Sequence, residues 1–259
     1  MVAILFKYGN YYSEERKVAE KFFSLKRLRT DCSCQTIIGR YSVLPYYLEL
    51  EADLKNKGCN LINSFEQHYY IASMDWTKDL KEMTPQTWDN FTFPNAPPGQ
   101  YVVKGETNSK KNQWDKLMFA PSKIDASKIA SQLSHDGLIG EQRIVYRKYV
   151  PLKTLEVGIN GIPFSNEWRF FFYKNTMLCY GFYWSSSEKR GKIDDKGIEF
   201  ARQCASIVSK KTNFFVIDIA EKAEGGWICI EVNDGQMSGL SECNPYELYS
   251  NLSTCKIGE

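Results

Sequence analysis

The chain is divided by a cluster of residues that break helices and strands, Asn95-Ala-Pro-Pro-Gly99. Before the cluster, short apolar segments with the pattern of strands alternate with segments that have the period of helices, as in α/β proteins. After it, longer strand-like segments follow one another in hairpins and are interrupted by two helical segments, which indicates an α+β arrangement. We therefore predict a small α/β domain over residues 1–95 and an α+β domain over residues 96–259.

Hydrophobic periodicity locates the expected elements more closely. Strands are expected over residues 2–6, 36–38, 61–63, 101–104, 139–149, 168–173, 177–184, 214–220 and 227–232. Helices are expected to begin near residues 13 and 45 and to cover residues 64–74, 126–133 and 196–210.

Composition limits the classes of protein to which the chain can belong. Its 259 residues are 43% hydrophobic and 25% charged, which is typical of a globular protein and excludes a disordered or collagen-like chain. The net charge of +2 argues against a basic nucleic-acid coat. Eight cysteines without a Cys-x-x-Cys pair, and only two histidines, argue against a zinc site. Because no secretion signal or membrane-spanning run is recognisable, we expect a cytoplasmic protein with reduced thiols and with neither membrane nor nucleic acid as a partner.

An apolar strand leads into a loop that is rich in groups able to bind phosphate. The strand over residues 101–104 ends at Lys104, and the loop that follows contains Ser109, Lys110 and Lys111. Backbone N–H groups, a hydroxyl and ammonium groups are the donors that a polyphosphate requires. The spacing differs from that of the Gly-x4-Gly-Lys-Ser/Thr loop, so an exposed basic hairpin is the alternative interpretation.

Three oxygen-bearing side chains are expected to share one patch of a β-hairpin. Glu231 and Asn233 are two residues apart and therefore lie on one face of a strand. Asp218 lies opposite Glu231 if the turn is at residues 224–225, and opposite Asn233 if it is at 225–226. Carboxylates so placed repel one another unless a cation joins them, and oxygen ligands favour Mg²⁺ or Mn²⁺ over zinc. The alternative is an exposed strand face with scattered charge.

Two further segments contribute candidate binding groups. Arg169 lies in the strand-like run 168–172, where its guanidinium must meet an anion. That anion is either a phosphate, which arginine can hold with two hydrogen bonds, or a structural carboxylate. A strand ending near residue 150 offers its backbone to an adenine edge at Arg147, Lys148, Tyr149 and Val150.

These segments together resemble the ATP-grasp superfamily and, within it, the divergent clade named for an arginine and two lysines, which includes the eukaryotic cell division cycle protein 123. The similarity covers most of the chain and involves residues 84–88, 101–111, 147–152, 167–169, 218 and 231–233. It implies an ATP-grasp fold of antiparallel sheets with packed helices, preceded by a small pre-ATP-grasp α/β domain over residues 1–95.

The resemblance also implies roles for individual residues. Lys104 and Lys111 are expected to contact ATP phosphates, with Arg169 facing the transferred phosphate. The metal carboxylates are expected at Asp218 and at Glu231, with Asn233 as a third ligand. The loop over residues 106–111 follows a single glycine where other members have a Gly-rich lid, which leaves open whether Lys110 or Lys111 contacts phosphate.

The function expected from these residues is an ATP- and Mg²⁺-dependent ligase that joins a carboxylate to an amine through an acyl phosphate. In it, Arg169 and Lys111 offset charge on the transferred group and are the candidate catalytic residues. The resemblance makes a protein or peptide a plausible substrate. The alternative function is a non-catalytic ATP-binding assembly factor for a partner protein. A nucleic-acid ligase is not expected, because the chain has no Lys-x-Asp-Gly element.

Overall fold

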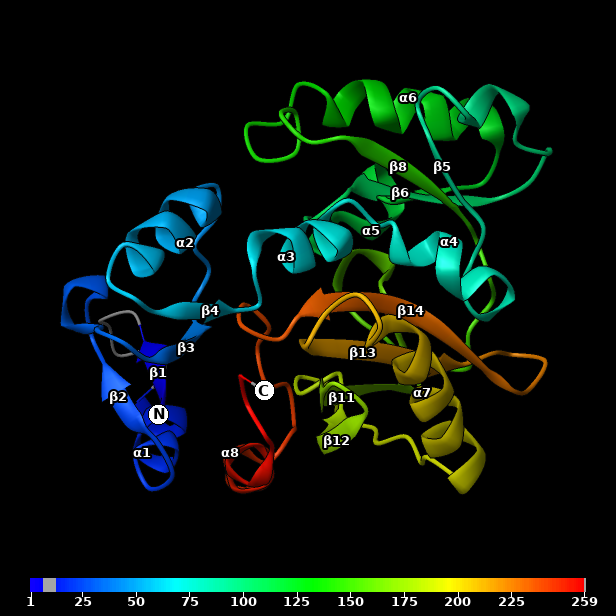
Figure 1. Cartoon of the computed structure of the whole chain (residues 1–259). Helices are drawn as coiled ribbons and strands as arrows, with labels where there is room; N and C mark the ends of the chain where they lie inside the picture. The colour runs from blue at the N-terminus through cyan, green and yellow to red at the C-terminus, as the bar shows by residue number, and fades with distance from the viewer. Residues whose placement is uncertain (7–12, 259) are drawn as a thin grey trace.

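The computed structural model describes residues 1–6 and 13–258. Its N-terminal part is a parallel sheet with the strand order β2-β1-β3-β4. The strands are β1 (Val2–Phe6), β2 (Ser24–Lys26), β3 (Thr36–Arg40) and β4 (Asn60–Ile62). Parallel neighbours require crossover connections, and helices α1 (Ser13–Ala19) and α2 (Tyr47–Lys55) lie in two of them. This part, drawn in blue in Figure 1, therefore has an α/β arrangement.

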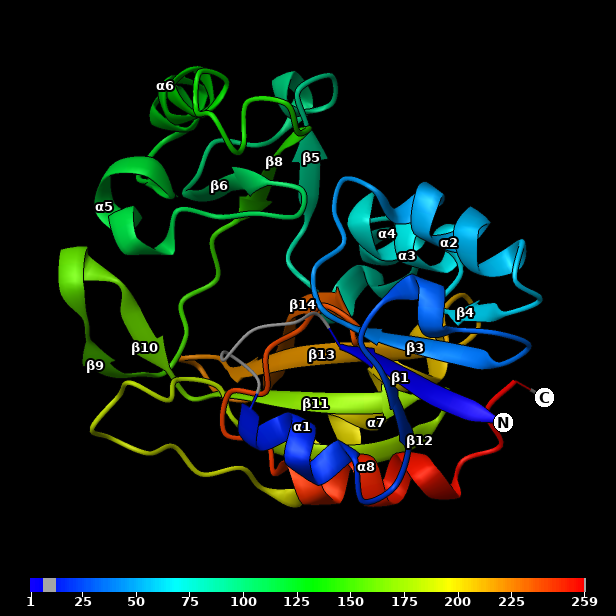
Figure 2. The same ribbon diagram turned by 90° about the vertical axis from the view of Figure 1, so that its left-hand side faces the viewer.

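A second, antiparallel sheet, the middle sheet, has the strand order β5-β8-β6-β7. Its strands are β5 (Thr87–Asp89), β6 (Tyr101–Gly105), β7 (Phe119–Ala120) and β8 (Ile144–Lys148). Helix α6 (Lys123–Leu133) packs on one face of this sheet through Ala126, Ile129 and Leu133, and the short helix α5 (Trp114–Leu117) lies beside it. A small hairpin of β9 (Thr154–Val157) and β10 (Pro163–Ser165) stands at the edge of the molecule (Figure 2).

A third sheet, the central sheet, is antiparallel with the strand order β12-β11-β13-β14. Its strands are β11 (Glu167–Tyr173), β12 (Thr176–Phe182), β13 (Phe214–Glu221) and β14 (Trp227–Asp234). One face packs against α7 (Asp195–Val208) and the short helices α3 (Phe65–Ala72) and α4 (Trp76–Leu80). The other packs against α8 (Pro245–Thr254) and the N-terminal sheet. Apolar cover on both faces explains why β11 and β13 are almost continuously apolar.

The expected α+β fold with antiparallel sheets is confirmed. The strand expected over residues 139–149 is shorter, because Asp136 accepts backbone hydrogen bonds from Leu138 and Ile139 and holds that stretch in a turn. The domain limit near residue 95 remains a prediction, and strand β5, which precedes that limit, pairs with β8, which follows it. Within residues 1–6 and 13–258, no helix is long and apolar enough to span a membrane.

Candidate nucleotide site

Two adjoining cavities lie where the middle sheet, the central sheet and the N-terminal part meet. The larger has a volume of about 440 Å³ and is lined by residues of all three, among them His68. The smaller, of about 120 Å³, has mostly apolar walls that include Met118 and Ile162. Both cavities are lined by Lys104, Ser109, Lys111 and Glu231. One elongated ligand with an apolar and a charged end could therefore occupy both.

The hairpin of β13 and β14 brings the three predicted metal ligands together. Asp218 lies opposite Glu231, as in the first of the two expected registers. The register near the turn differs, with Ile219 opposite Cys229, and a bulge between Asp218 and Ile219 restores the pairing. The Asn233 amide donates a hydrogen bond of 3.4 Å to Asp218 Oδ2. The three side chains thus form one polar patch inside a largely apolar sheet.

Arg169 meets an anion that belongs to the protein itself. It lies opposite Asp218 on β11, and its Nε and Nη2 donate to the two carboxylate oxygens at 2.9 and 2.8 Å. A third hydrogen bond, from Nη1, reaches the carbonyl of Gly239 at 2.7 Å. Burial lowers the pKa of Arg169, but the Asp218 carboxylate outweighs this effect and raises the pKa above its ordinary value. The structural salt bridge is therefore present, and an additional phosphate contact remains a prediction.

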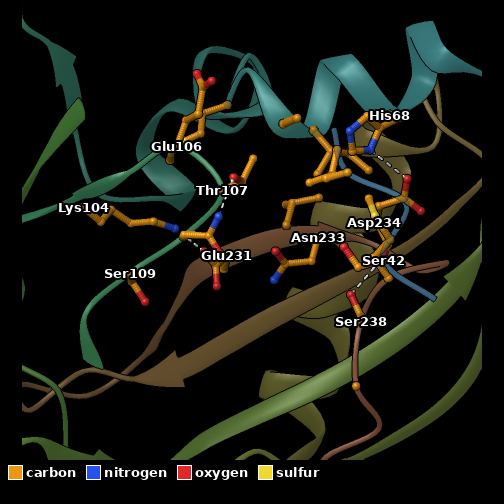
Figure 3. Close-up of a pocket in the computed structure, with 18 of the residues that line it drawn as sticks. Ser42, His68, Lys104, Glu106, Thr107, Ser109, Glu231, Asn233, Asp234 and Ser238 are labelled. Atoms are coloured by element: carbon orange, nitrogen blue, oxygen red, sulfur yellow. Dashed lines mark hydrogen bonds and ion pairs between the residues drawn. The ribbon is translucent and has the colours of Figure 1, made fainter. Parts of the chain in front are cut away.

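Lys104 and Glu231 form an ion pair across the two sheets (Figure 3). The Lys104 side chain is 7% exposed and comes from β6, whereas Glu231 comes from β14. Burial raises the pKa of Glu231, but the ammonium groups of Lys104 and Lys111 outweigh this effect and hold the pKa well below its usual value. The carboxylate is therefore ionised, and a predicted phosphate ligand contacts a predicted metal ligand directly.

The two loop lysines point to different places. Lys110 pairs with Asp136 at 2.5 Å and does not line either of the two cavities. Lys111 lines both, and its Nζ donates to the Tyr183 hydroxyl at 2.6 Å. Burial lowers the pKa of Lys111, but Tyr183 and nearby carboxylates outweigh this effect and raise the pKa above its ordinary value. Lys111 is therefore the loop lysine placed to reach a ligand, and Ser109 lies beside it on the walls of both cavities.

The predicted hinge residues surround the smaller cavity. Arg147, Lys148, Tyr149 and Val150 all line it. The Arg147 guanidinium is held by protein groups, because it donates to Thr84 Oγ1 at 2.8 Å and to the carbonyl of Ile230. Burial lowers its pKa. The backbone of this strand and the apolar walls are therefore what the cavity offers to a planar base.

A family model for an ATP-grasp domain matches residues 93–252, more than half of the chain. The model describes family 3 of the clade that is named for an arginine and two lysines. The chain belongs to this family. The resemblance to the ATP-grasp superfamily is thereby confirmed, whereas a closer relation to the branch that contains cell division cycle protein 123 remains a prediction.

Solved structures support the ATP-grasp fold over nearly the whole chain. A D-cycloserine synthetase is 10% identical with a TM-score of 0.63, covering 98% of this chain and 99% of that one. A macrocyclase from Microcystis aeruginosa, bound with a precursor peptide, is 11% identical with a TM-score of 0.55 and covers 98% of each chain. D-alanine–D-alanine ligase from Bacillus anthracis, complexed with ATP, is 10% identical with a TM-score of 0.55, covering 90% of this chain and 85% of that one. No curated protein matches the sequence significantly.

The donor set of this ATP-grasp protein fits a hard divalent cation. Asp218, Glu231 and Asn233 offer only oxygen ligands, which Mg²⁺ prefers. Asp218 is fully buried and lines neither cavity, and its Oδ2 accepts from both Arg169 and Asn233. Its Oδ1 accepts from Arg169 alone, which leaves one lone pair for a cation. The described part of the chain contains no group of three or more His, Cys, Asp or Glu side chains arranged to hold a metal. Metal binding by the mixed set of two carboxylates and an amide remains a prediction.

Sequence reasoning missed Glu167 as a member of the site. Glu167 lies two residues before Arg169, lines the smaller cavity and is 3% exposed. Its Oε2 accepts a hydrogen bond from Ser165 at 3.2 Å, while Oε1 has no partner among the described residues. Burial raises the pKa of this carboxyl to about 7. The alternation of side chains along β11 places it on the face that carries Arg169, and this signal could have identified it.

Sequence reasoning also missed a set of contacts, here called the Asp234 clamp, between the N-terminal part and the end of β14. Asp234 directly follows Asn233 and is 4% exposed. Its carboxylate accepts hydrogen bonds from Asn63 at 3.1 Å and from the Gln236 backbone amide at 2.9 Å, and it pairs with His68 Nδ1 at 3.0 Å (Figure 3). The N-terminal part thereby fixes the strand end that carries a predicted metal ligand.

Proposed function

We propose that this ATP-grasp protein is an ATP- and Mg²⁺-dependent ligase that joins a carboxylate to an amine. The continuity of the two cavities carries the proposal. The apolar cavity at the hinge suits adenine, and the shared Lys104, Lys111 and Glu231 lie where a polyphosphate and its metal would follow. The larger cavity then receives the substrates beside the terminal phosphate.

The proposed reaction proceeds in two steps. A carboxylate oxygen of the first substrate attacks the terminal phosphorus of ATP, ADP leaves, and an acyl phosphate forms. The amine then attacks the acyl carbon, inorganic phosphate leaves, and loss of a proton from nitrogen gives the amide. Mg²⁺ would neutralise phosphate charge, while Lys104, Lys111 and Arg169 offset the charge that develops on the transferred group.

We further propose a protein or peptide as the carboxylate substrate. The larger cavity, about 440 Å³, is bounded on one side by Ser42, Leu44 and His68 of the N-terminal part, so a substrate could contact both parts of the chain. The likeness in fold to a macrocyclase bound with a precursor peptide supports this class. We also propose a cytoplasmic location, which the eight free thiols support, because reducing compartments keep cysteines unpaired.

Nucleotide binding is the first test. ATP with Mg²⁺ at about 100 times its dissociation constant should add roughly 2.7 kcal/mol to the free energy of unfolding, measured as a rise in Tm. ATP with a chelator should add less. An unchanged melting curve with millimolar ATP and Mg²⁺ would contradict the proposal.

Turnover is the second test. Release of ADP over many turnovers should require both a carboxylate and an amine, supplied from panels of peptides and amines, and hydroxylamine should trap the acyl phosphate as a hydroxamate. Glu231→Gln and Asn233→Ala should abolish this release while the protein stays folded. ATP binding without ADP release for any pair would instead favour an ATP-binding assembly factor.

A further inference from the structure

Tyr183 lies between the two cations that are expected to act on phosphate. Its hydroxyl accepts the hydrogen bond of 2.6 Å from Lys111 Nζ, and the same ammonium lies 4.6 Å from the centre of its ring. The Arg169 guanidinium carbon lies 4.8 Å from that centre. Both positive groups thus contact the same ring, and the electron-rich face of an aromatic ring attracts cations.

Among the described residues, no carboxylate lies within ion-pair distance of Lys111, although Glu231 and Glu167 are near enough to raise its pKa. Arg169 is paired with Asp218, whereas Lys111 forms no ion pair within the described part of the chain and is held by Tyr183 and, at 5.6 Å, by the ring of Trp184. A half-buried ammonium whose direct contacts are a neutral hydroxyl and aromatic rings keeps N–H donors available for an anionic ligand. Lys111 and Tyr183 both line the larger cavity, so such an anion can reach them.

The contact also joins two parts of the fold. Lys111 belongs to the loop that follows β6 of the middle sheet, whereas Tyr183 directly follows β12 of the central sheet, 72 residues later. The Tyr183 contact therefore fixes a side chain of a loop from one sheet over the surface of the other.

We propose that Tyr183 is a positioning residue that orients Lys111 toward the phosphates of the bound nucleotide, an inference that rests on the proposed function. An ammonium has three N–H donors, so the bond to Tyr183 leaves two for phosphate oxygens. The ring meanwhile keeps Arg169 and Lys111 on one side of the cavity despite their like charges.

The experiment measures the Kd of ATP with Mg²⁺ by titration calorimetry for the wild type and for Tyr183→Phe, Lys111→Met and the double variant. Tyr183→Phe keeps the ring and removes the hydroxyl, and we expect its Kd to rise about tenfold, since a hydrogen bond to a charged group is lost. In the Lys111→Met background the same change should raise the Kd less than about twofold, because Tyr183 acts through Lys111. Tyr180→Phe, three residues earlier on β12, is the matched control and should bind as the wild type does.

The double-variant comparison separates positioning from packing. If Tyr183→Phe weakens binding equally with and without Lys111, or does not weaken it at all, the inference is overturned. Melting curves of each variant without nucleotide show whether a loss comes from a damaged fold, which would appear as a lowered Tm. A wild type that binds no ATP would contradict the proposed function itself, whereas a wild type that binds ATP without this coupling would contradict only the role of Tyr183.

Discussion

The pair of Arg169 and Asp218 places full charges inside an apolar sheet, where each depends on the other for compensation. Arg169→Lys keeps the charge but loses the planar two-pronged contact with Asp218. We expect a loss on the order of 3 kcal/mol in the free energy of unfolding, with or without nucleotide, because breaking a buried pair leaves a charge poorly compensated. Urea denaturation measures this loss.

Arg190→Lys is the control for that change. Arg190 also pairs with a carboxylate, Glu242 at 2.7 Å, but its side chain is 49% exposed. Water already solvates such a pair, so the change should stay within about 0.5 kcal/mol. Equal losses at Arg169 and Arg190 would show that the buried geometry contributes nothing.

Glu167 gives the stability of the protein a distinct dependence on pH. Its pKa rises from the ordinary 4.5 to about 7 in the folded chain, because burial disfavours the charge. Between these values the folded state binds a proton that the unfolded state has lost, so this group's stabilising contribution is present below pH 4.5 and is lost as the pH rises through 7. Glu167→Gln should therefore gain about 3 kcal/mol relative to the wild type between pH 4.5 and 8.

The measurement compares the unfolding free energies of the wild type and Glu167→Gln at a series of pH values. A difference that does not change between pH 5 and 8 would show that the carboxyl titrates normally.

Among the elements, the hairpin of β13 and β14 positions the patch of predicted metal ligands, and its turn depends on glycine. Gly225 has a φ of +93°, in the region that side chains disfavour, while the position of an added Cβ is open. Gly225→Ala should therefore cost about 1–2 kcal/mol through backbone strain alone. Gly99→Ala, at a site that is equally open but without a positive φ, should change stability by less than about 1 kcal/mol. Thermal unfolding of the two variants provides the comparison.

The same hairpin shows what periodicity can and cannot predict. The alternation of side chains along the strands predicted that Asp218, Glu231 and Asn233 share one patch, and the structure confirms this placement. The prediction was possible because residues two apart on a strand lie on the same face. The bulge, in which Ile230 of β14 is the extra residue, could not be predicted, because an extra residue leaves no local signal in so apolar a strand. Tyr183 was missed because its role depends on the contact with Lys111, which lies 72 residues away in the sequence.

At the scale of the whole molecule, the Asp234 clamp unites the N-terminal part with the central sheet. Asp234→Ala removes the buried acceptor of hydrogen bonds from Asn63 and the Gln236 backbone amide. We expect a loss on the order of 3 kcal/mol in the free energy of unfolding, with one transition for both parts. Asp53→Ala, which removes a carboxylate that is 48% exposed, should cost less than about 1 kcal/mol. Two separate transitions in the wild type would show that the clamp does not couple the parts.

The change from alternating strands and helices to antiparallel hairpins could be predicted from the sequence, whereas the packing of these segments on one another could not. Helices α3 and α4 precede the breaker cluster near residue 95 and yet cover the central sheet through Ile71 and Trp76. The clamp residues His68 and Asn63 meet Asp234 only across the fold, so an isolated histidine gave no hint of its role. Long-range packing of this kind requires the assembled fold.

The clamp also sets an order of events during protein synthesis. Asn63 bonds the Phe214 carbonyl 151 residues later, and His68 pairs with Asp234 166 residues later. At a translation rate of 5–20 residues per second, the ribosome needs roughly 8–33 s to supply Asp234 after His68. During that interval the apolar side chains of α3 and α4 cannot yet be buried against the complete central sheet. Chaperones that bind nascent chains would therefore meet this protein before its candidate nucleotide site has formed.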